Sequence, residues 1–287
     1  MVRDDRHQRS TTRAHGGHRP RANSIAGRGF RSADRLLAEP ADDRRHVAWG
    51  CRQSRRAPTG DPGFDPPGQG GSQPLTQMFT FAECARCVVD ILDGLGIDRA
   101  HFVGNSWGGM IGATFAATYP ERIGRAVLMN CTAGKASLRQ KVQFAILLRM
   151  ARWRGGIGPL LIRPVLKAFL GPTTFRERPD VVAHVRSAVG KVNIASASWA
   201  VKSVVSARPD QRALLAGITT PVLVVGGAED VTFPPREAIE MADAIPGSSV
   251  RVLDGVAHLA GLEDPSLASS LVEEFLFKDG ESGSAAL

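Results

Sequence analysis

The stretch from Arg99 to Gly112, RAHFVGNSWGGMIG, most strongly constrains how this chain can fold. A short apolar run of strand length meets Gly104-Asn105-Ser106-Trp107-Gly108, and a helical pattern of apolar residues follows at once. Gly-x-Ser-x-Gly between a strand and a helix predicts a nucleophile elbow, a sharp turn that raises the serine hydroxyl above the end of a parallel strand. We therefore predict that Ser106 is a nucleophile and that the N–H of Trp107, at the helix start, is an oxyanion donor. The flanking patterns disfavour a glycine-rich turn with an incidental serine.

Strand-length apolar runs and helical patterns alternate along most of the chain after residue 62. We expect helices at 79–95, 236–244 and 265–277, and strands at 100–103, 126–129, 222–225 and 250–253. Repeated strand–helix units are typical of an α/β protein with a doubly wound, mostly parallel sheet. The sequence therefore predicts an α/β core built from residues 63–131 and 208–287.

The alternation stops between residues 132 and 207, where only helical patterns occur. The expected helices cover 137–153, 159–170, 180–189 and 196–206. An insertion at this point of the chain would lie over the carboxyl ends of the strands, where open α/β sheets bind their ligands. We therefore predict a helical cap whose residues Arg149, Trp153, Phe169 and Trp199 line a substrate pocket, although a cap helix also needs apolar residues simply to pack.

A serine hydroxyl needs a base, and the base needs a group that orients it. His258 follows the expected strand 250–253, and Asp230 follows the apolar strand 222–225, so both would reach the sheet edge that carries Ser106. The order Ser, Asp, His along the chain is the order found in α/β hydrolases. Four other acidic residues could take the role of Asp230. Glu229 is one residue from the tip of the turn, and the other three are expected nearer solvent or the last helix: Asp254, Glu263 and Asp264.

Residues 64–277 resemble the capped α/β-hydrolase superfamily, through GNSWGG, GAED and AHLAGLEDP. The resemblance implies a catalytic triad of Ser106, Asp230 and His258. Asn105, placed here as a substrate-binding residue, and the helical cap are most similar to those of meta-cleavage-product hydrolases and 3-oxoadipate enol-lactonases.

The expected function is therefore a cofactor-independent serine hydrolase that acts on an ester, an enol-lactone or a carbon–carbon bond of a small carbonyl substrate. No metal or nucleotide motif is present, so we predict no cofactor and no metal. A protein of another class, a non-catalytic ligand-binding homologue that retains the pocket, would share the same fold. An enzyme left inactive by a missing oxyanion loop is a further alternative.

Residues 1–62 lack the periodic pattern of the rest of the chain. They hold 14 Arg, no Lys and 7 acidic residues, so this segment carries +7 of the net charge of +8. Two interpretations are open, a basic disordered arm or a misread reading frame, and we favour the second because the segment is Arg-rich and patternless. The superfamily places strands and a His-Gly oxyanion loop here, and Ala14-His15-Gly16-Gly17 has no preceding apolar strand. The chain as written is then expected to be poorly soluble and nearly inactive.

The distribution of charge limits the classes of partner that we expect for the chain. The basic excess outside residues 1–62 is only +1, so we expect neither nucleic acid nor a membrane as partner, but a small-molecule substrate and a possible homo-oligomer. No signal peptide and no apolar run of about 18 residues is visible, which predicts a cytoplasmic protein. Cys84-x-x-Cys87 has no second Cys or His pair nearby, and its helical spacing with Phe81 and Val88 predicts a core position rather than a redox or zinc site.

Overall fold

The structure is a computed structural model that describes residues 67–68 and 72–277. The predictions about residues 1–62, namely the basic arm, the misread frame and the Ala14–Gly17 loop, lie outside these residues. The same holds for the strand that the superfamily places before Asp65.

The described sheet consists of four parallel strands in the order β1-β2-β3-β4, with the bounds β1 (Ala100–Asn105), β2 (Ile123–Met129), β3 (Val222–Gly227) and β4 (Ser249–Leu253). Every residue of β3 is buried, as expected of an unbroken apolar run in a parallel strand covered on both faces. Alternate residues of β2 supply the two faces: Ala126 and Leu128 face one core cluster, and Val127 and Met129 face the other. The predicted α/β fold with a parallel sheet is therefore confirmed.

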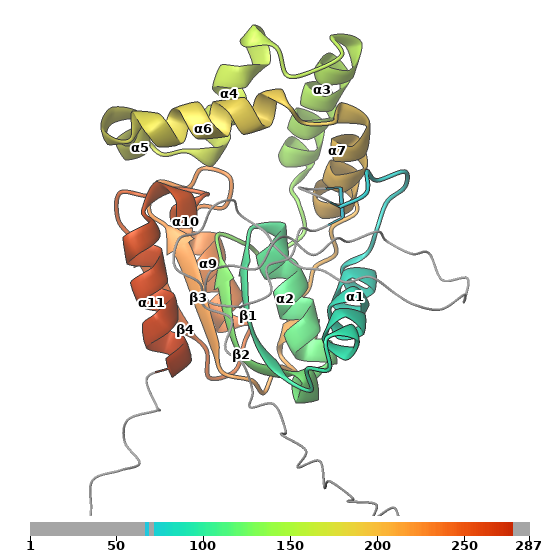
Figure 1. Cartoon of the computed structure of the whole chain (residues 1–287), viewed down its shortest axis with the longest axis vertical. Helices are drawn as coiled ribbons and strands as arrows, with labels where there is room; N and C mark the ends of the chain where they lie inside the picture. Colours follow the sequence, from blue (N-terminus) through green and yellow to red (C-terminus); the bar gives the residue numbers. More distant parts are fainter. Residues whose placement is uncertain (1–66, 69–71, 278–287) are drawn as a thin grey trace, which may run out of the picture.

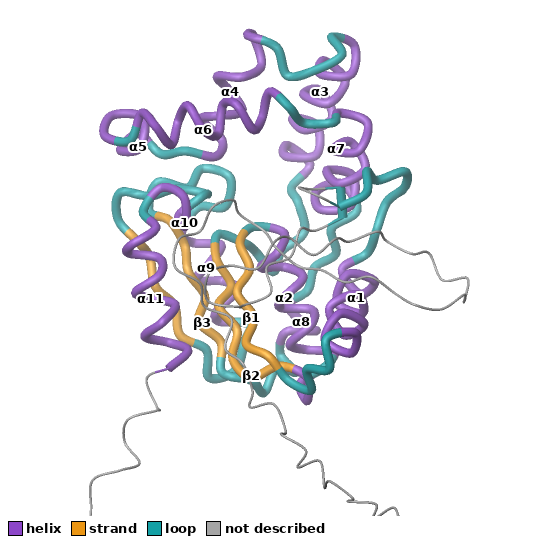
Figure 2. The backbone as a smooth tube through the Cα atoms, viewed as in Figure 1, coloured by secondary structure: helices purple, strands orange, loops and turns teal. Residues whose placement is uncertain are grey.

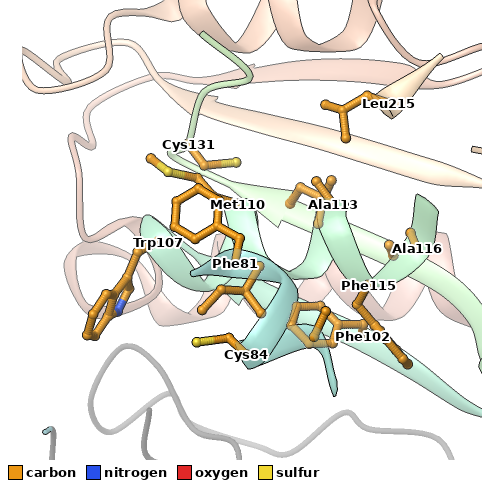
Figure 3. Packing of buried hydrophobic residues seen from close by; sticks show 14 of the residues in the cluster. Phe81, Cys84, Phe102, Trp107, Met110, Ala113, Phe115, Ala116, Cys131 and Leu215 are labelled. Atoms are coloured by element: carbon orange, nitrogen blue, oxygen red, sulfur yellow. The ribbon is translucent and has the colours of Figure 1, made fainter. Parts of the chain in front are cut away.

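Helices cover both faces of this sheet (Figure 1). The larger cluster packs α1 (Phe81–Gly94), α2 (Trp107–Thr118) and α9 (Pro235–Asp243) on one face, and the other cluster packs α11 (Pro265–Phe277) on the opposite face. Figure 3 shows Phe102 of β1 close to Phe115 of α2 within the larger cluster. Short helical turns complete the core: η1 (Pro120–Arg122), α8 (Arg212–Leu215) and α10 (Ala260–Glu263).

Helix α1 illustrates how local sequence sets these elements. Thr80 and Glu83 form a capping box in which the Glu83 N–H donates to the Thr80 hydroxyl at 3.1 Å, and this starts the helix. Cys84 and Val88 lie on its buried face, at 5 % and 4 % exposure. Cys84 is therefore a core residue, as predicted, and Cys87 beside it is half-buried.

The chain between β2 and β3 contains only helices and loops. Before α8 its elements are α3 (Leu138–Trp153), α4 (Pro159–Phe169), α5 (Pro172–Glu177), α6 (Pro179–Gly190), α7 (Ile194–Val201) and the π-helix η2 (Lys202–Ser206). We call α3 to η2 the helical insertion. It lies beyond the carboxyl ends of the strands in Figures 1 and 2 and has a small apolar cluster of its own, which includes Leu166 and Val185. That residues 132–207 form a separate cap domain stays a prediction.

The insertion differs from expectation in two places. Helix α5 was not predicted, because Gly171-Pro172 reads as a break and only six residues of helix follow it. The helix expected over 196–206 ends as α7 at Val201, and a π-helical turn continues from Lys202.

Candidate active site

Ser106 lies in a sharp turn between β1 and α2. Its backbone has φ 55° and ψ −123°, outside the regions that side-chain-bearing residues normally adopt, and its N–H donates to the Met129 carbonyl at 2.8 Å. The turn is tight, because a Cβ at Gly104 would lie 2.5 Å from the Gly108 backbone. These features match the strained elbow expected from the sequence. Trp107 is the first residue of α2, and its proposed role as oxyanion donor stays a prediction.

A chain of two hydrogen bonds joins Ser106, His258 and Asp230. The Ser106 Oγ lies 2.8 Å from His258 Nε2, and His258 Nδ1 lies 2.9 Å from Asp230 Oδ2. Both the His258 and the Asp230 side chains are buried, at 1 % and 2 % exposure. With its proton on Nδ1, the imidazole donates to the carboxylate and presents Nε2 as the acceptor for the serine hydroxyl. The tertiary structure thus brings together three side chains that are up to 152 residues apart in sequence.

The Asp230 carboxylate is held by further donors. Its Oδ1 accepts from the N–H groups of Thr232 and Phe233 at 2.8 and 2.9 Å, and its Oδ2 accepts from Asn130 Nδ2 at 3.2 Å. Charge-assisted bonds to backbone N–H groups fix the rotamer of a buried carboxylate. Asp230 is therefore oriented on His258 by the turn that carries it.

Asn130 is a site residue that sequence reasoning missed. It follows β2 directly, has a φ of 47°, and its Nδ2 also donates to the Ala257 carbonyl at 2.8 Å. It therefore links the loop of the acid to the loop of the base. The available signal was a polar residue directly after an apolar strand, at the same sheet edge as Ser106.

Two phenylalanines pack against the His258 ring. The centroids of Phe169 and Phe233 lie 5.7 and 5.5 Å from the imidazole centroid. Phe169 comes from α4 of the insertion, so this predicted pocket residue does contact a member of the triad. The rings keep the imidazole in an apolar setting and leave its two nitrogens to Ser106 and Asp230.

The other predicted substrate-binding residues occupy different settings. Asn105 donates through Nδ2 to the His258 carbonyl at 3.1 Å, and its Oδ1 is buried without a hydrogen-bond partner. Trp199 packs against the larger core cluster, with Lys202 Nζ 4.1 Å from its ring centroid. Arg149 and Trp153 are exposed on α3, with Trp153 at 83 %. The substrate-binding role of all four stays a prediction.

Glu263 lies two residues before the last helix, α11, as one of the two expected placements had it. It is not near solvent, because it is 1 % exposed and its carboxylate accepts four hydrogen bonds. Oε1 accepts from the N–H groups of Ala257 and Leu259, on either side of His258, at 2.9 and 3.1 Å. Oε2 accepts from the Gly171 N–H and the Thr174 hydroxyl of the insertion at 3.1 and 2.6 Å. Glu263 is therefore a positioning group for the loop of His258, not an alternative to Asp230.

Glu229 forms a parallel link from the neighbouring loop. Its carboxylate accepts from the Thr173 N–H at 2.9 Å and from the Thr173 hydroxyl at 2.6 Å. A Cβ at Gly171 would overlap this carboxylate, which explains the glycine before α5. The competing acids Glu229 and Glu263 therefore both bind the start of α5 and leave His258 to Asp230.

The described residues contain no group of three or more His, Cys, Asp or Glu side chains that could hold a metal ion. The candidate site itself is a buried imidazole between a carboxylate and a hydroxyl. Such an arrangement can move a proton from the serine hydroxyl to Nε2 and stabilise the resulting imidazolium.

Comparisons with known proteins identify the fold family. The family model described as "alpha/beta hydrolase fold" matches residues 63–265. A 2-hydroxy-6-oxononadienedioate/2-hydroxy-6-oxononatrienedioate hydrolase of Burkholderia vietnamiensis is 29 % identical over 219 residues, which cover 74 % of each chain.

Solved structures of other proteins share this fold. The enol-lactonase of Burkholderia xenovorans is 28 % identical, with a TM-score of 0.66, over 73 % of this chain and 77 % of its own. A thermophilic esterase of Thermogutta terrifontis is 25 % identical, also with a TM-score of 0.66, over 76 % of this chain and 78 % of its own.

Proposed function

The chain belongs to the α/β-hydrolase fold family, and we propose that it is a cofactor-independent serine hydrolase with Ser106 as nucleophile, His258 as general base and Asp230 as orienting acid. The hydrogen-bonded chain from Ser106 Oγ through His258 to Asp230 carries this proposal. The relatives whose names state a hydrolase activity support it at the level of reaction class.

The proposed reaction follows from these positions. His258 Nε2 accepts the proton of Ser106 as Oγ attacks the substrate carbonyl carbon, and the imidazolium then donates that proton to the leaving group. Water activated by the same nitrogen releases the acid from the serine. Asp230 remains ionised throughout and stabilises the imidazolium. The Trp107 N–H, at the positive end of α2, would stabilise the oxyanion.

We propose an ester, an enol-lactone or a carbon–carbon bond of a small carbonyl compound as the substrate. Support comes from the enol-lactonase, the esterase and the oxononadienedioate hydrolase, which all align with this chain at 25–29 % identity. In each substrate class an electrophilic carbonyl carbon lies next to the bond that is cleaved. A panel of short esters, enol-lactones and ring-fission products, assayed with wild type and Ser106→Ala, would assign the class.

The nucleophile is tested by labelling and by turnover. A fluorophosphonate should modify Ser106, identified by peptide mass spectrometry, and Ser106→Ala should lose both the label and the hydrolysis of p-nitrophenyl butyrate. Labelling reports the activated serine even where turnover is slow. Equal hydrolysis by wild type and Ser106→Ala, or labelling elsewhere only, would contradict the proposal.

The alternative of a non-catalytic ligand-binding homologue predicts a different result. In that case wild type would bind members of the substrate panel in calorimetry, without labelling at Ser106 and without turnover. Ser106→Ala would then bind them with the same affinity.

A further inference from the structure

Helix α3 exposes an apolar stripe to solvent. Leu138, Val142, Ile146 and Trp153 are 79, 50, 55 and 83 % exposed. Their spacing of four, four and seven residues places them on one face of the helix. Ala151, the buried residue of α3, lies on the opposite face. The side of the helix that faces away from the insertion therefore carries apolar residues where a surface helix normally carries polar ones.

A further exposed apolar residue follows on α4, after the turn. Leu160, in the first turn of α4, is 67 % exposed. The turn that joins the two helices lies at the end of the molecule farthest from the sheet (Figure 2). We call Leu138, Val142, Ile146, Trp153 and Leu160 the tip stripe.

The chain segment that carries the tip stripe has charges of a single sign. Residues 131–176 contain nine Lys or Arg residues and no Asp or Glu. Arg149, Arg152 and Arg154, next to Trp153, are all exposed. No ion pair found in the described part of the chain involves these three. The net charge of the chain beyond residue 62 is only +1, yet this segment of it is strongly basic.

We propose that the tip stripe docks onto the surface of an anionic lipid bilayer. Trp153 and Leu160 would enter the headgroup region, and the arginines would contact lipid phosphates, as in helices that lie in the plane of a membrane interface. A second copy of the chain fits less well, since it would face one basic edge with another. Nucleic acid would use the arginines but leave the apolar side chains exposed.

The proposal concerns docking on a surface and not insertion across a bilayer. No helix among the described residues is long and apolar enough to span a membrane. The sequence argument against a membrane partner relied on the absence of such a run and on net charge, and neither bears on a helix that lies in the interface. The tip stripe contains no triad residue, and Trp153 is the one member that was also predicted to line the substrate pocket; the proposal does not depend on the triad.

Vesicle sedimentation tests it with the full chain. Wild type should bind vesicles of phosphatidylcholine with 30 % phosphatidylglycerol and bind pure phosphatidylcholine more weakly. Trp153→Ser with Leu160→Ser should weaken the binding at least about tenfold. Arg152→Gln with Arg154→Gln should weaken it by about fivefold for each charge removed. Leu214→Ser with Leu267→Ser, two exposed residues elsewhere, is the matched control and should bind as wild type does.

A second readout separates the stripe from the basic residues 1–62. Brominated phosphatidylcholine should quench tryptophan fluorescence in wild type, and Trp153→Phe should lose most of that quenching while still binding. Unfolding curves that match wild type would show that the variants fold. No binding by wild type, unchanged binding after Trp153→Ser with Leu160→Ser, or a dimer that this double variant dissociates without any vesicle binding would overturn the proposal.

Discussion

The buried carboxylate of Glu263 accepts a 2.6 Å hydrogen bond from the Thr174 hydroxyl, across the boundary between the α/β core and the helical insertion. Glu229 makes the equivalent link to Thr173, from the loop that carries Asp230. The loops of the proposed acid and base are therefore both tied to the start of α5. The insertion is thus hydrogen-bonded to the loops of both the proposed acid and the proposed base.

Glu263→Gln should lower both activity and stability. In the amide an NH₂ group replaces one acceptor oxygen. At the Oε1 position it would face two N–H donors, and at the Oε2 position it would face the Gly171 N–H and a hydroxyl that can accept from it, so one or two of the four hydrogen bonds are lost. We expect a loss of about 2–4 kcal/mol in the free energy of unfolding in urea. The rate of fluorophosphonate labelling at Ser106 should fall about tenfold, because the loop of His258 loses its support.

The exposed Glu273→Gln is the matched control and should leave both quantities unchanged. Wild-type stability together with wild-type labelling in Glu263→Gln would contradict the positioning role.

Asn130 should be replaceable by glycine more readily than by alanine. The backbone of Asn130 has a φ of 47°, and alanine adopts this conformation at a free-energy cost about 1 kcal/mol higher than glycine does. Asn130→Ala should therefore unfold at a lower urea concentration than Asn130→Gly. Both variants remove the amide that donates to Asp230 and to the Ala257 carbonyl. We therefore expect labelling of Ser106 to slow about tenfold in both. Equal stability of the two variants, or undiminished labelling, would argue against this account.

His101 should make the fold sensitive to mild acid. Burial, together with Arg125 and Arg99, lowers the pKa of His101, and its Nδ1 accepts the Arg125 N–H at 2.9 Å. Because the unfolded state binds the proton more readily, stability from this residue is present above the usual histidine pKa of about 6.5 and is lost as pH falls below it. Thermal melts at pH 7.5 and 5.5 should therefore show a smaller drop in His101→Asn than in wild type. The exposed His184→Asn should match wild type.

Cys131 should resist alkylation in the native protein. Burial, and secondarily the negative charge of Asp230, raise the pKa of its thiol well above the usual range, so little thiolate forms at neutral pH. Iodoacetamide at pH 8, followed by peptide mass spectrometry, should modify the half-buried Cys87 well before Cys131. In urea the two should react at similar rates. Rapid native modification of Cys131 would show that the loop after β2 opens.

The sequence was informative wherever the signal is local. Gly104 to Gly108 between a strand and a helix indicated the elbow, and the apolar run 222–225 indicated a buried parallel strand. The chain order of Ser106, Asp230 and His258, each just after a strand, indicated their common sheet edge, because parallel strands end on the same side. These patterns depend on a few neighbouring residues and on the regular geometry of parallel sheets.

Other features became visible only in the tertiary structure, because they depend on contacts between residues that are distant in sequence. The sequence placed Glu263 near solvent or the last helix but did not reveal its role, because nothing nearby shows that Gly171 and Thr174, 92 and 89 residues away, donate to it. The role of Asn130 depends in the same way on Asp230 and Ala257, 100 and 127 residues away. The spacing of apolar residues on α3 shows that they share a face. Only the packing of the insertion decides that this face points to solvent, because burial is a property of the assembled chain.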